Sequence, residues 1–498
     1  MSACSSESWF RVRRTNEGQF VSEGLLQASF GYTIPLPGRD KPGGIFARWR
    51  WTGSALEAEN DRYGFYPLFY TTGGGWIAIS PSLPKLVKLT GMWELDDAAL
   101  AVFLRLGFFL GESTPFRHIK AMPPDGRLCW RDGQLHVQGH RHIAPASRYS
   151  RDEIASAYID LFRQSIRRHP PTSDRFAMPL SGGRDSRHIL LELLACGHKP
   201  QFCVTAEAFP AFRAQETWAA AQIAGATGTA HVVVRQPPSY VRAERERFHI
   251  TRCLSDEHLL FLPVARYMQS RGIESSYDGI AGGIFSAGAF QERGQQEMIR
   301  AGRGHDFARA VMWPGPEHML ALEWRTRFSG ELAAEAIAAE AERYYNAPNP
   351  VANFYFWNRT RREIALSPYA VQSEIPCVYA PYLDPDLYDF LSSLPAEETL
   401  DHNLHTDVIA RAYPQYADVP YAGSITPNYR APWRLSRIMA EAALECISRS
   451  SGFLDLKYLL PRLGYAVARP SYAAQMFGRI RSILYFVNLG AFLQGGGG

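Results

Sequence analysis

Through the first part of the chain, apolar and polar residues alternate, a period of two that predicts β-strands. The segment 44–51 follows this pattern. Glycine-containing turns at 71–75 and 132–133 each separate two short apolar runs, which is typical of β-hairpins. We therefore expect a β-rich region over residues 1–145.

The pattern changes near residue 150. Ser150 and Glu153 form a capping box, and the apolar residues after them recur at helical spacing. Short apolar strands at 202–205, 231–234 and 274–277 then alternate with helical segments at 215–226 and 258–270. This alternation predicts a doubly wound parallel sheet, with ligands at the carboxyl ends of its strands.

Beyond residue 300 the chain is expected to be mostly helical, and its last seventy residues are expected to form packed helices rich in arginine. These changes of pattern divide the chain into 1–145, 146–425 and 426–498.

Composition narrows the class of protein. The 498 residues are 46% hydrophobic and 20% charged, with a net charge of +4, as in a folded soluble protein. The dispersed basic residues give no reason to expect a nucleic-acid partner. Seven scattered cysteines without a Cys-x-x-Cys pair favour the reducing cytoplasm. The N-terminus has no signal-peptide core, and the apolar stretch 483–487 is too short to span a bilayer, so we expect no membrane partner.

The segment 180–186, Leu-Ser-Gly-Gly-Arg-Asp-Ser, is chemically the most informative. An apolar run at 176–180 precedes it and a helical pattern at 187–194 follows, which predicts a strand, a tight turn and a helix start. The glycines allow a close approach of the backbone, and the free N–H groups at a helix start attract anions. This segment is therefore predicted to bind an anion.

Ser-Gly-Gly-x-Asp-Ser at 181–186 resembles the pyrophosphate loop of the PP-loop ATP pyrophosphatases. Other segments resemble motifs of the asparagine synthetase family, which includes β-lactam synthetases and lasso-peptide cyclases. They are a glutaminase-domain hairpin at 61–70, a domain-joining segment at 116–126, Gln-Glu at 215–216 on a helix where the family has Asn-Glu or Asp-Glu, and Pro-Tyr-Leu-Asp at 381–384. The likeness spans residues 55 to 425.

This resemblance implies an α/β chain with three parts. Residues 1–145 would form a degenerate glutaminase domain of the Ntn-hydrolase type, and 146–425 a PP-loop synthetase domain. Residues 426–498 would form a helical C-terminal extension.

The resemblance also implies a reaction. A substrate carboxylate attacks the α-phosphorus of ATP in the presence of Mg²⁺, pyrophosphate leaves, and an amine or ammonia then displaces AMP to give an amide. The implied roles are pyrophosphate binding by Ser181, Gly182, Gly183 and Ser186, Mg²⁺ binding by Asp185, and backbone contact with adenosine by Leu180 and Val204.

The chain departs from the family at the start. A glutaminase of this family begins with cysteine and glycine directly after the initiator, whereas here Cys4 is internal and followed by serine. An N-terminal nucleophile uses its own α-amine as the base, so an internal cysteine cannot serve without trimming. We expect no glutamine hydrolysis, and we expect Asp61, at a position that reads glutamine in the family, to be a relic.

A second departure lies at 277–283, where the family has an acidic pair. Here that pair is replaced by Gly282 and Gly283, which removes a Mg²⁺ ligand. Tyr277 and Asp278 are expected at the nucleotide site, with Asp278 as a substitute metal ligand if the loop bends differently. Arg184 and Arg187 add two guanidinium groups that pair well with phosphate, unless Arg187 points to solvent.

A third departure lies at 406–411, where the family carries a lysine for the amide-forming step. Asp407 stands in its place here, with His405 close by. We expect Asp407, His405, Asp185 and Arg184 to be catalytic, although a surface position for the histidine is an open alternative.

The favoured hypothesis is an ATP-dependent, AMP-forming amide ligase that joins a small-molecule or peptide carboxylate to ammonia or an amine. A macrolactam or β-lactam cyclase of the same family is one alternative. A non-catalytic nucleotide-binding scaffold is another, favoured by Gly282, Gly283 and Asp407. A second copy of the chain, or a protein of the same biosynthetic cluster, is a possible partner.

Overall fold

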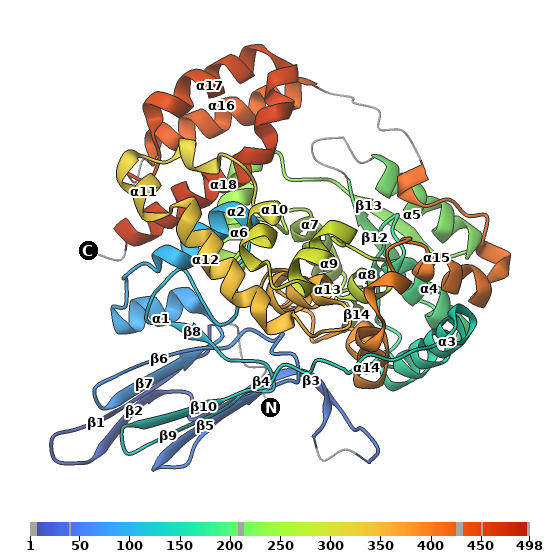
Figure 1. Cartoon of the computed structure of the whole chain (residues 1–498), viewed down its shortest axis with the longest axis horizontal. Helices are drawn as coiled ribbons and strands as arrows, with labels where there is room; N and C mark the ends of the chain where they lie inside the picture. The colour runs from blue at the N-terminus through green and yellow to red at the C-terminus, as the bar shows by residue number, and fades with distance from the viewer. Residues whose placement is uncertain (1–6, 39–40, 208–213, 425–431, 450–451, 496–498) are drawn as a thin grey trace.

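A computed structural model describes residues 7–38, 41–207, 214–424, 432–449 and 452–495. Cys4 lies outside the described residues. The protein is mixed α/β, with antiparallel sheets in the N-terminal part and parallel strands later (Figure 1). Among the described residues, no helix is both long enough and apolar enough to cross a membrane.

Two five-stranded sheets form the N-terminal β-rich part, at the lower left of Figure 1. The first has the order β2 (Phe20–Gly24), β1 (Phe10–Arg14), β7 (Trp76–Ser80), β6 (Phe69–Gly73) and β8 (Lys120–Ala121). The second has the order β10 (Gln134–Gln138), β9 (Arg127–Arg131), β5 (Ala55–Asn60), β4 (Gly43–Trp51) and β3 (Gln27–Ile34). Both predicted hairpins are confirmed, because β6 pairs with β7 and β9 with β10 in antiparallel register.

Five short parallel strands form the second part. The three-stranded sheet has the order β11 (Met178–Pro179), β12 (Cys203–Ala206) and β13 (His231–Val234), and β14 (Ser275–Tyr277) pairs with β15 (Cys377–Tyr379). A parallel bridge from Phe176 to Ser275 places β14 beside the start of β11. The order across both sheets is therefore β13-β12-β11-β14-β15. From β11 the chain adds β12 and β13 on one side and then β14 and β15 on the other, so the strand order reverses between β11 and β14.

Helices account for the remainder. In the first half they are α1 (Leu83–Thr90), α2 (Asp97–Leu106), α3 (Arg151–Arg168), α4 (Asp185–Ala195), α5 (Ala214–Ala226), α6 (Tyr240–Ile250), α7 (Phe261–Ser270) and α8 (Gly282–Ser286). Next come α9 (Arg293–Arg300), α10 (Gly304–Val311), α11 (Leu322–Arg327), α12 (Gly330–Ala341), α13 (Pro350–Tyr355), α14 (Pro385–Ser393) and α15 (Leu404–Ala412). The C-terminal helices are α16 (Pro432–Ser448), α17 (Leu456–Ala468) and α18 (Pro470–Gln494).

Two expected elements differ in extent. The strand expected over 176–180 is reduced to β11, and the helix expected from residue 258 begins at Phe261. His258 has a φ of 73°, a left-handed conformation that a helix cannot contain. The capping box on α3 is confirmed, since Ser150 accepts from Glu153 and Glu153 reaches back to Ser150.

One hydrophobic core runs through all three parts of the chain. The last helix, α18, contributes to the core of the first part, since Tyr485 packs on Phe103 with 4.1 Å between ring centroids. Phe492 lies against Trp93 and Phe116 in the same way. The C-terminal helices are thus packed into the molecule.

Candidate functional site

The loop 181–184 joins β11 to α4 at the carboxyl edge of the parallel strands, where the strand order reverses. Ser186 Oγ accepts from the Ser181 amide at 3.0 Å, and the two serine hydroxyls lie 3.1 Å apart. Ser181 Oγ accepts in turn from the Gly183 amide at 3.1 Å. The predicted strand, turn and helix start are therefore present, and the hydroxyl groups of Ser181 and Ser186 lie side by side in the turn.

The first turn of α4 is open to a ligand. Within the described part of the chain, its N-cap residue, Arg184, makes no side-chain cap hydrogen bond to the first N–H groups. Arg184 at the N-cap position donates from Nε to Thr406 Oγ1 at 2.5 Å. This arrangement favours an anion, because the helix dipole and the free amides act together.

Glu216 from α5 uses one donor of the loop. Its Oε2 accepts from the Gly182 amide at 2.7 Å. A Cβ atom on Gly182 would lie 2.6 Å from Ala422 Cβ and 2.9 Å from Ala219 Cβ, so this position has no room for a side chain. Two further segments therefore pack tightly around the loop.

Residues 419–422, here called the strap, lie across the loop. Arg187 holds them, donating to the carbonyls of Val419 at 2.6 Å and Pro420 at 2.5 Å, while its guanidinium lies 3.7 Å from the Tyr421 ring centroid. The Ala422 amide donates to Gly182 O at 3.0 Å. The expectation of a solvent-facing Arg187 is thus wrong, as is that of a phosphate ligand: its side chain is buried and its donors serve the strap.

Asp185 packs against the glycine-rich turn that follows β14. A Cβ on Gly282 would lie 2.6 Å from Asp185 Cγ, and one on Gly279 would lie 2.8 Å from Asp185 Cβ. A side chain at Gly283 would meet nothing closer than 3.7 Å. Asp185 can therefore occupy its observed position only because residue 282 has no side chain.

Burial raises the pKa of the Asp185 carboxyl to about 7, although the charge of Arg184 and the N–H of Gly283 oppose the shift. Burial also raises the pKa of Asp278 to about 6. Asp278 accepts from the Ile280 amide at 2.9 Å and from Gln372 Nε2 at 3.3 Å. The charge of Asp278 adds to the rise in the pKa of Asp185, so the two carboxyl groups are near enough for their charges to repel.

His405 lies beneath Asp185 and is completely buried, which overturns the alternative of a surface histidine. Its Nδ1 is 3.4 Å from Asp185 Oδ1 and 3.1 Å from Ser286 Oγ. Its Nε2 is 3.2 Å from His188 Nδ1 and 3.3 Å from the Tyr382 hydroxyl. Burial lowers the pKa of His405 to about 3, so the ring is neutral.

Hydrogen-bond accounting assigns the proton of that neutral ring. The Ser286 hydroxyl donates to Gly282 O, so Ser286 Oγ acts as an acceptor toward His405. Asp185 offers another acceptor on the same side. We therefore infer an Nδ1–H tautomer, with the hydrogen directed at Asp185 and Ser286. His405 is a positioning residue for Asp185, since its burial keeps it from any substrate.

Four other predicted residues, Asp407, Tyr277, Leu180 and Val204, are placed away from the ligand groups of the loop or use their polar atoms elsewhere. The Asp407 carboxylate is 57% exposed and pairs with Arg151 at 3.0 Å, so the structure does not bring it to the loop. The Tyr277 ring is buried and its hydroxyl donates to His169 O at 2.6 Å, which leaves its backbone at the site. Leu180, which directly follows β11, donates from its N–H to Val204 O at 2.9 Å, so these two backbone atoms are used by each other.

Asp185 and Asp278 offer Mg²⁺ fewer protein ligands than a metal site made of protein side chains alone would need. Among the described residues, no group of three or more acidic, histidine or cysteine side chains could hold a metal ion. Asp185 and Asp278 supply two carboxylates, and Mg²⁺ in phosphate-transfer sites is held by one or two carboxylates together with substrate phosphates. Mg²⁺ therefore fits here in company with a phosphate ligand.

Asp61 has a structural role. Its carboxylate is fully buried and accepts from the amides of Tyr63 at 2.9 Å, Phe65 at 3.2 Å and Tyr66 at 3.1 Å. Burial raises the pKa of Asp61 to about 6, against the effect of these amides. Its acceptors are used within its own turn, and the interpretation of Asp61 as a relic stays a prediction.

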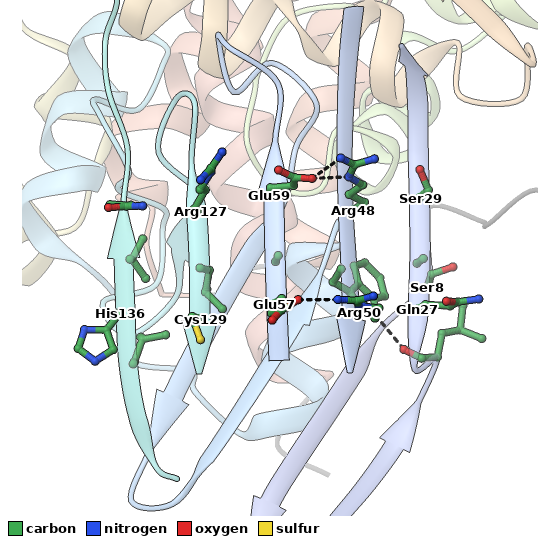
Figure 2. Close-up of a pocket in the computed structure, with 18 residues that line it drawn as sticks. Ser8, Gln27, Ser29, Arg48, Arg50, Glu57, Glu59, Arg127, Cys129 and His136 are labelled. Carbon is green, nitrogen blue, oxygen red and sulfur yellow. Dashed lines mark hydrogen bonds and ion pairs between the residues drawn. The ribbon is translucent and has the colours of Figure 1, made fainter. Parts of the chain in front are cut away.

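A hollow of about 1570 Å³ lies on the outer face of the second antiparallel sheet. Figure 2 shows Arg48 facing Glu59 and Arg50 facing Glu57 across β4 and β5. The register continues these rows to Cys129 and Arg127 on β9. Since Arg48 and Arg50 are each already paired with a glutamate on this face, the loop after β11 is the better candidate site.

Sequence reasoning missed the buried side chains under the loop: Tyr158, His188, Ser286 and Tyr382. They come from four separate segments, so no local pattern joins them. Tyr382 did fall within a motif that carried the resemblance. No family model matches the chain, and no curated protein matches it significantly.

Proposed function

We propose that the chain is an ATP-dependent amide ligase of the asparagine synthetase type. The observation that carries this proposal is the uncapped start of α4 behind the Ser181–Ser186 loop, at the reversal point of the strand order. Ligands of parallel α/β sheets bind at this point. The same order supports a PP-loop fold for the parallel part, and the paired antiparallel sheets support a degenerate glutaminase fold.

The chain's own residues divide the work. The free amides of α4 and the hydroxyls of Ser181 and Ser186 bind the leaving pyrophosphate. Arg184 is anchored through Nε to Thr406, and its terminal nitrogens would pair with the same anion. His405 orients Asp185, which with Asp278 would hold Mg²⁺. When bound, Mg²⁺ neutralises phosphate charge as the carboxylate oxygen attacks and pyrophosphate departs.

A nucleotide-binding scaffold is the second candidate. The packing of Asp185 against Gly279 and Gly282 favours it, because this packing fills the space where a further acidic ligand would stand. The scaffold would bind ATP at the same loop and form no acyl-adenylate.

Substrate-dependent exchange of pyrophosphate into ATP separates the two. A ligase should catalyse exchange with one of a panel of carboxylates, and Asp185→Ala should lower the rate about a hundredfold or more. Asp152→Ala, at an 88% exposed position, is the matched control and should leave the rate unchanged. ATP binding without exchange across the panel would rule out the ligase and support the scaffold.

A further inference from the structure

A small cavity of about 180 Å³ opens beyond the strand edge that carries the loop. Its floor is the turn 235–238 after β13 together with Glu207 after β12, and α16 closes it from above. Neighbouring strands are about 4.8 Å apart, so the end of β13 lies about 10 Å from the end of β11. The cavity is therefore close enough to hold part of a substrate that reacts at the loop.

Gln236 is the unusual residue of this cavity. Its side-chain nitrogen and oxygen are both shielded from solvent, and neither has a hydrogen-bond partner in the described structure. Leaving such groups unpaired is costly, and native proteins avoid it. The adjoining Pro237 and Pro238 have no N–H to offer, so a ligand is the natural partner for this amide.

A primary amide presents a donor beside an acceptor, and another amide satisfies both at once. Arg235 and Glu207 flank Gln236, and neither side chain has an ion-pair partner among the residues that the structure describes. Arg434 adds a half-buried guanidinium beside Trp433, which is 61% exposed. Arg437 and Glu441, by contrast, are paired with each other at 2.8 Å.

We propose that this cavity binds the amide and carboxylate of a peptide-like acid, with Gln236 pairing to the amide and Arg434 to the carboxylate. The proposal rests on the proposed function in naming the cavity's ligand as the substrate, and it makes that substrate an acylated amino acid or peptide. Among the described residues that line the cavity, two guanidinium groups without an ion pair, Arg235 and Arg434, stand against one such carboxylate, Glu207. This excess of positive charge favours an amide that carries a carboxylate over an uncharged nucleobase, which could also pair with Gln236.

The test uses the full chain and measures binding by NMR saturation transfer and titration. The probes are N-acetyl-alanyl-alanine, its methyl ester and ATP. Gln236→Leu should weaken binding of the free acid about tenfold and leave ATP binding unchanged. Gln138→Leu, on the exposed sheet face, is the matched control. Arg434→Met should remove the preference of the protein for the acid over the ester.

The variants remain folded on physical grounds, because replacing an unpaired buried amide with leucine removes an unfavourable group. A higher melting temperature for Gln236→Leu, measured alongside, would establish this. Equal binding of the acid to the wild type and Gln236→Leu would overturn the proposal. Weakened ATP binding with unchanged acid binding would overturn it as well, and would assign the cavity to the nucleobase.

Failure of the proposed function gives a different result. If no carboxylate supports pyrophosphate exchange but N-acetyl-alanyl-alanine still binds through Gln236, the ligase is refuted and the cavity assignment holds.

Discussion

At the scale of single residues, the adjacent glycines Gly282 and Gly283 differ in how much space each has for a side chain. A Cβ on Gly282 would collide with the Asp185 carboxyl group and the Tyr382 ring, whereas one on Gly283 would make only ordinary contacts, none closer than 3.7 Å. The difference follows from the close packing of Asp185, since neither glycine has a positive φ.

Gly282→Ala should therefore destabilise the protein by about 1–3 kcal/mol, because the new Cβ overpacks Asp185. Gly283→Ala, the matched control, should change stability by about 0.5 kcal/mol or less. Urea unfolding monitored by fluorescence gives both values. Equal stability of the two variants would show that Asp185 does not pack as described.

The raised pKa of Asp61 predicts how the folding stability of the protein depends on pH. Its pKa is raised by burial to about 6 from an ordinary value of 3.8. A raised folded-state pKa means that the folded protein prefers the protonated carboxyl. Its contribution to stability is fully present below pH 3.8 and is lost as the pH rises through 6, a change of about 3 kcal/mol at most.

The stability of the wild type relative to Asp61→Asn should thus fall by about 3 kcal/mol or less between pH 4 and pH 7, since asparagine does not titrate there. Taking the difference between the two proteins cancels the titration of all other groups. A difference that is constant with pH would show that the Asp61 pKa is not raised by folding.

At the scale of elements, the strap 419–422 depends on one side chain. Arg187→Met keeps the buried stem but removes both donors to Val419 and Pro420. We expect a loss of about 2–4 kcal/mol and faster amide exchange at Ala422, since two carbonyls lose charged partners. Arg187→Lys should not restore the strap, because one ammonium cannot replace the planar guanidinium.

Hydrogen exchange measured by mass spectrometry checks this prediction. Arg411→Met, which removes an exposed pair with Asp152, is the control and should leave exchange at the strap unchanged. Unaltered protection of the strap in Arg187→Met would contradict the role given to Arg187.

The elements that sequence could predict are those with a local signature. The loop after β11 could be predicted because its glycines and the start of α4 are contiguous. Helix α6 was missed because two charged residues, Glu244 and Arg247, are buried on it as a pair at 2.7 Å. Burial of paired charges hides the apolar stripe that marks a helix.

The candidate site shows the same limit. Its glycines, serines and Asp185 could be found from one motif, whereas the neighbours of His405 could not. Tyr158 lies on the buried face of α3, among the apolar residues that recur there at helical spacing, but that spacing gives no sign that its hydroxyl reaches Ser286 at 3.3 Å. Contacts between distant segments depend on the whole fold.

At the scale of the whole molecule, two buried arginines tie the antiparallel part to the rest. Arg361 donates to Met122 O at 2.6 Å, and Arg362 donates to Gly111 O. Burial lowers the pKa of Arg362 to about 9. With the shared hydrophobic core, these bonds indicate that the β-rich part and the parallel part depend on one another for stability.

The packing of α18 on α2 bears on how the chain is made. Phe103 is synthesised long before Tyr485, its packing partner in α18. A growing chain therefore leaves the ribosome exit tunnel with an apolar surface on α2 that stays uncovered until α18 has also emerged. Folding of the first hundred residues is completed only then, and a chaperone that covers Phe103 in the meantime would protect the nascent chain from aggregation.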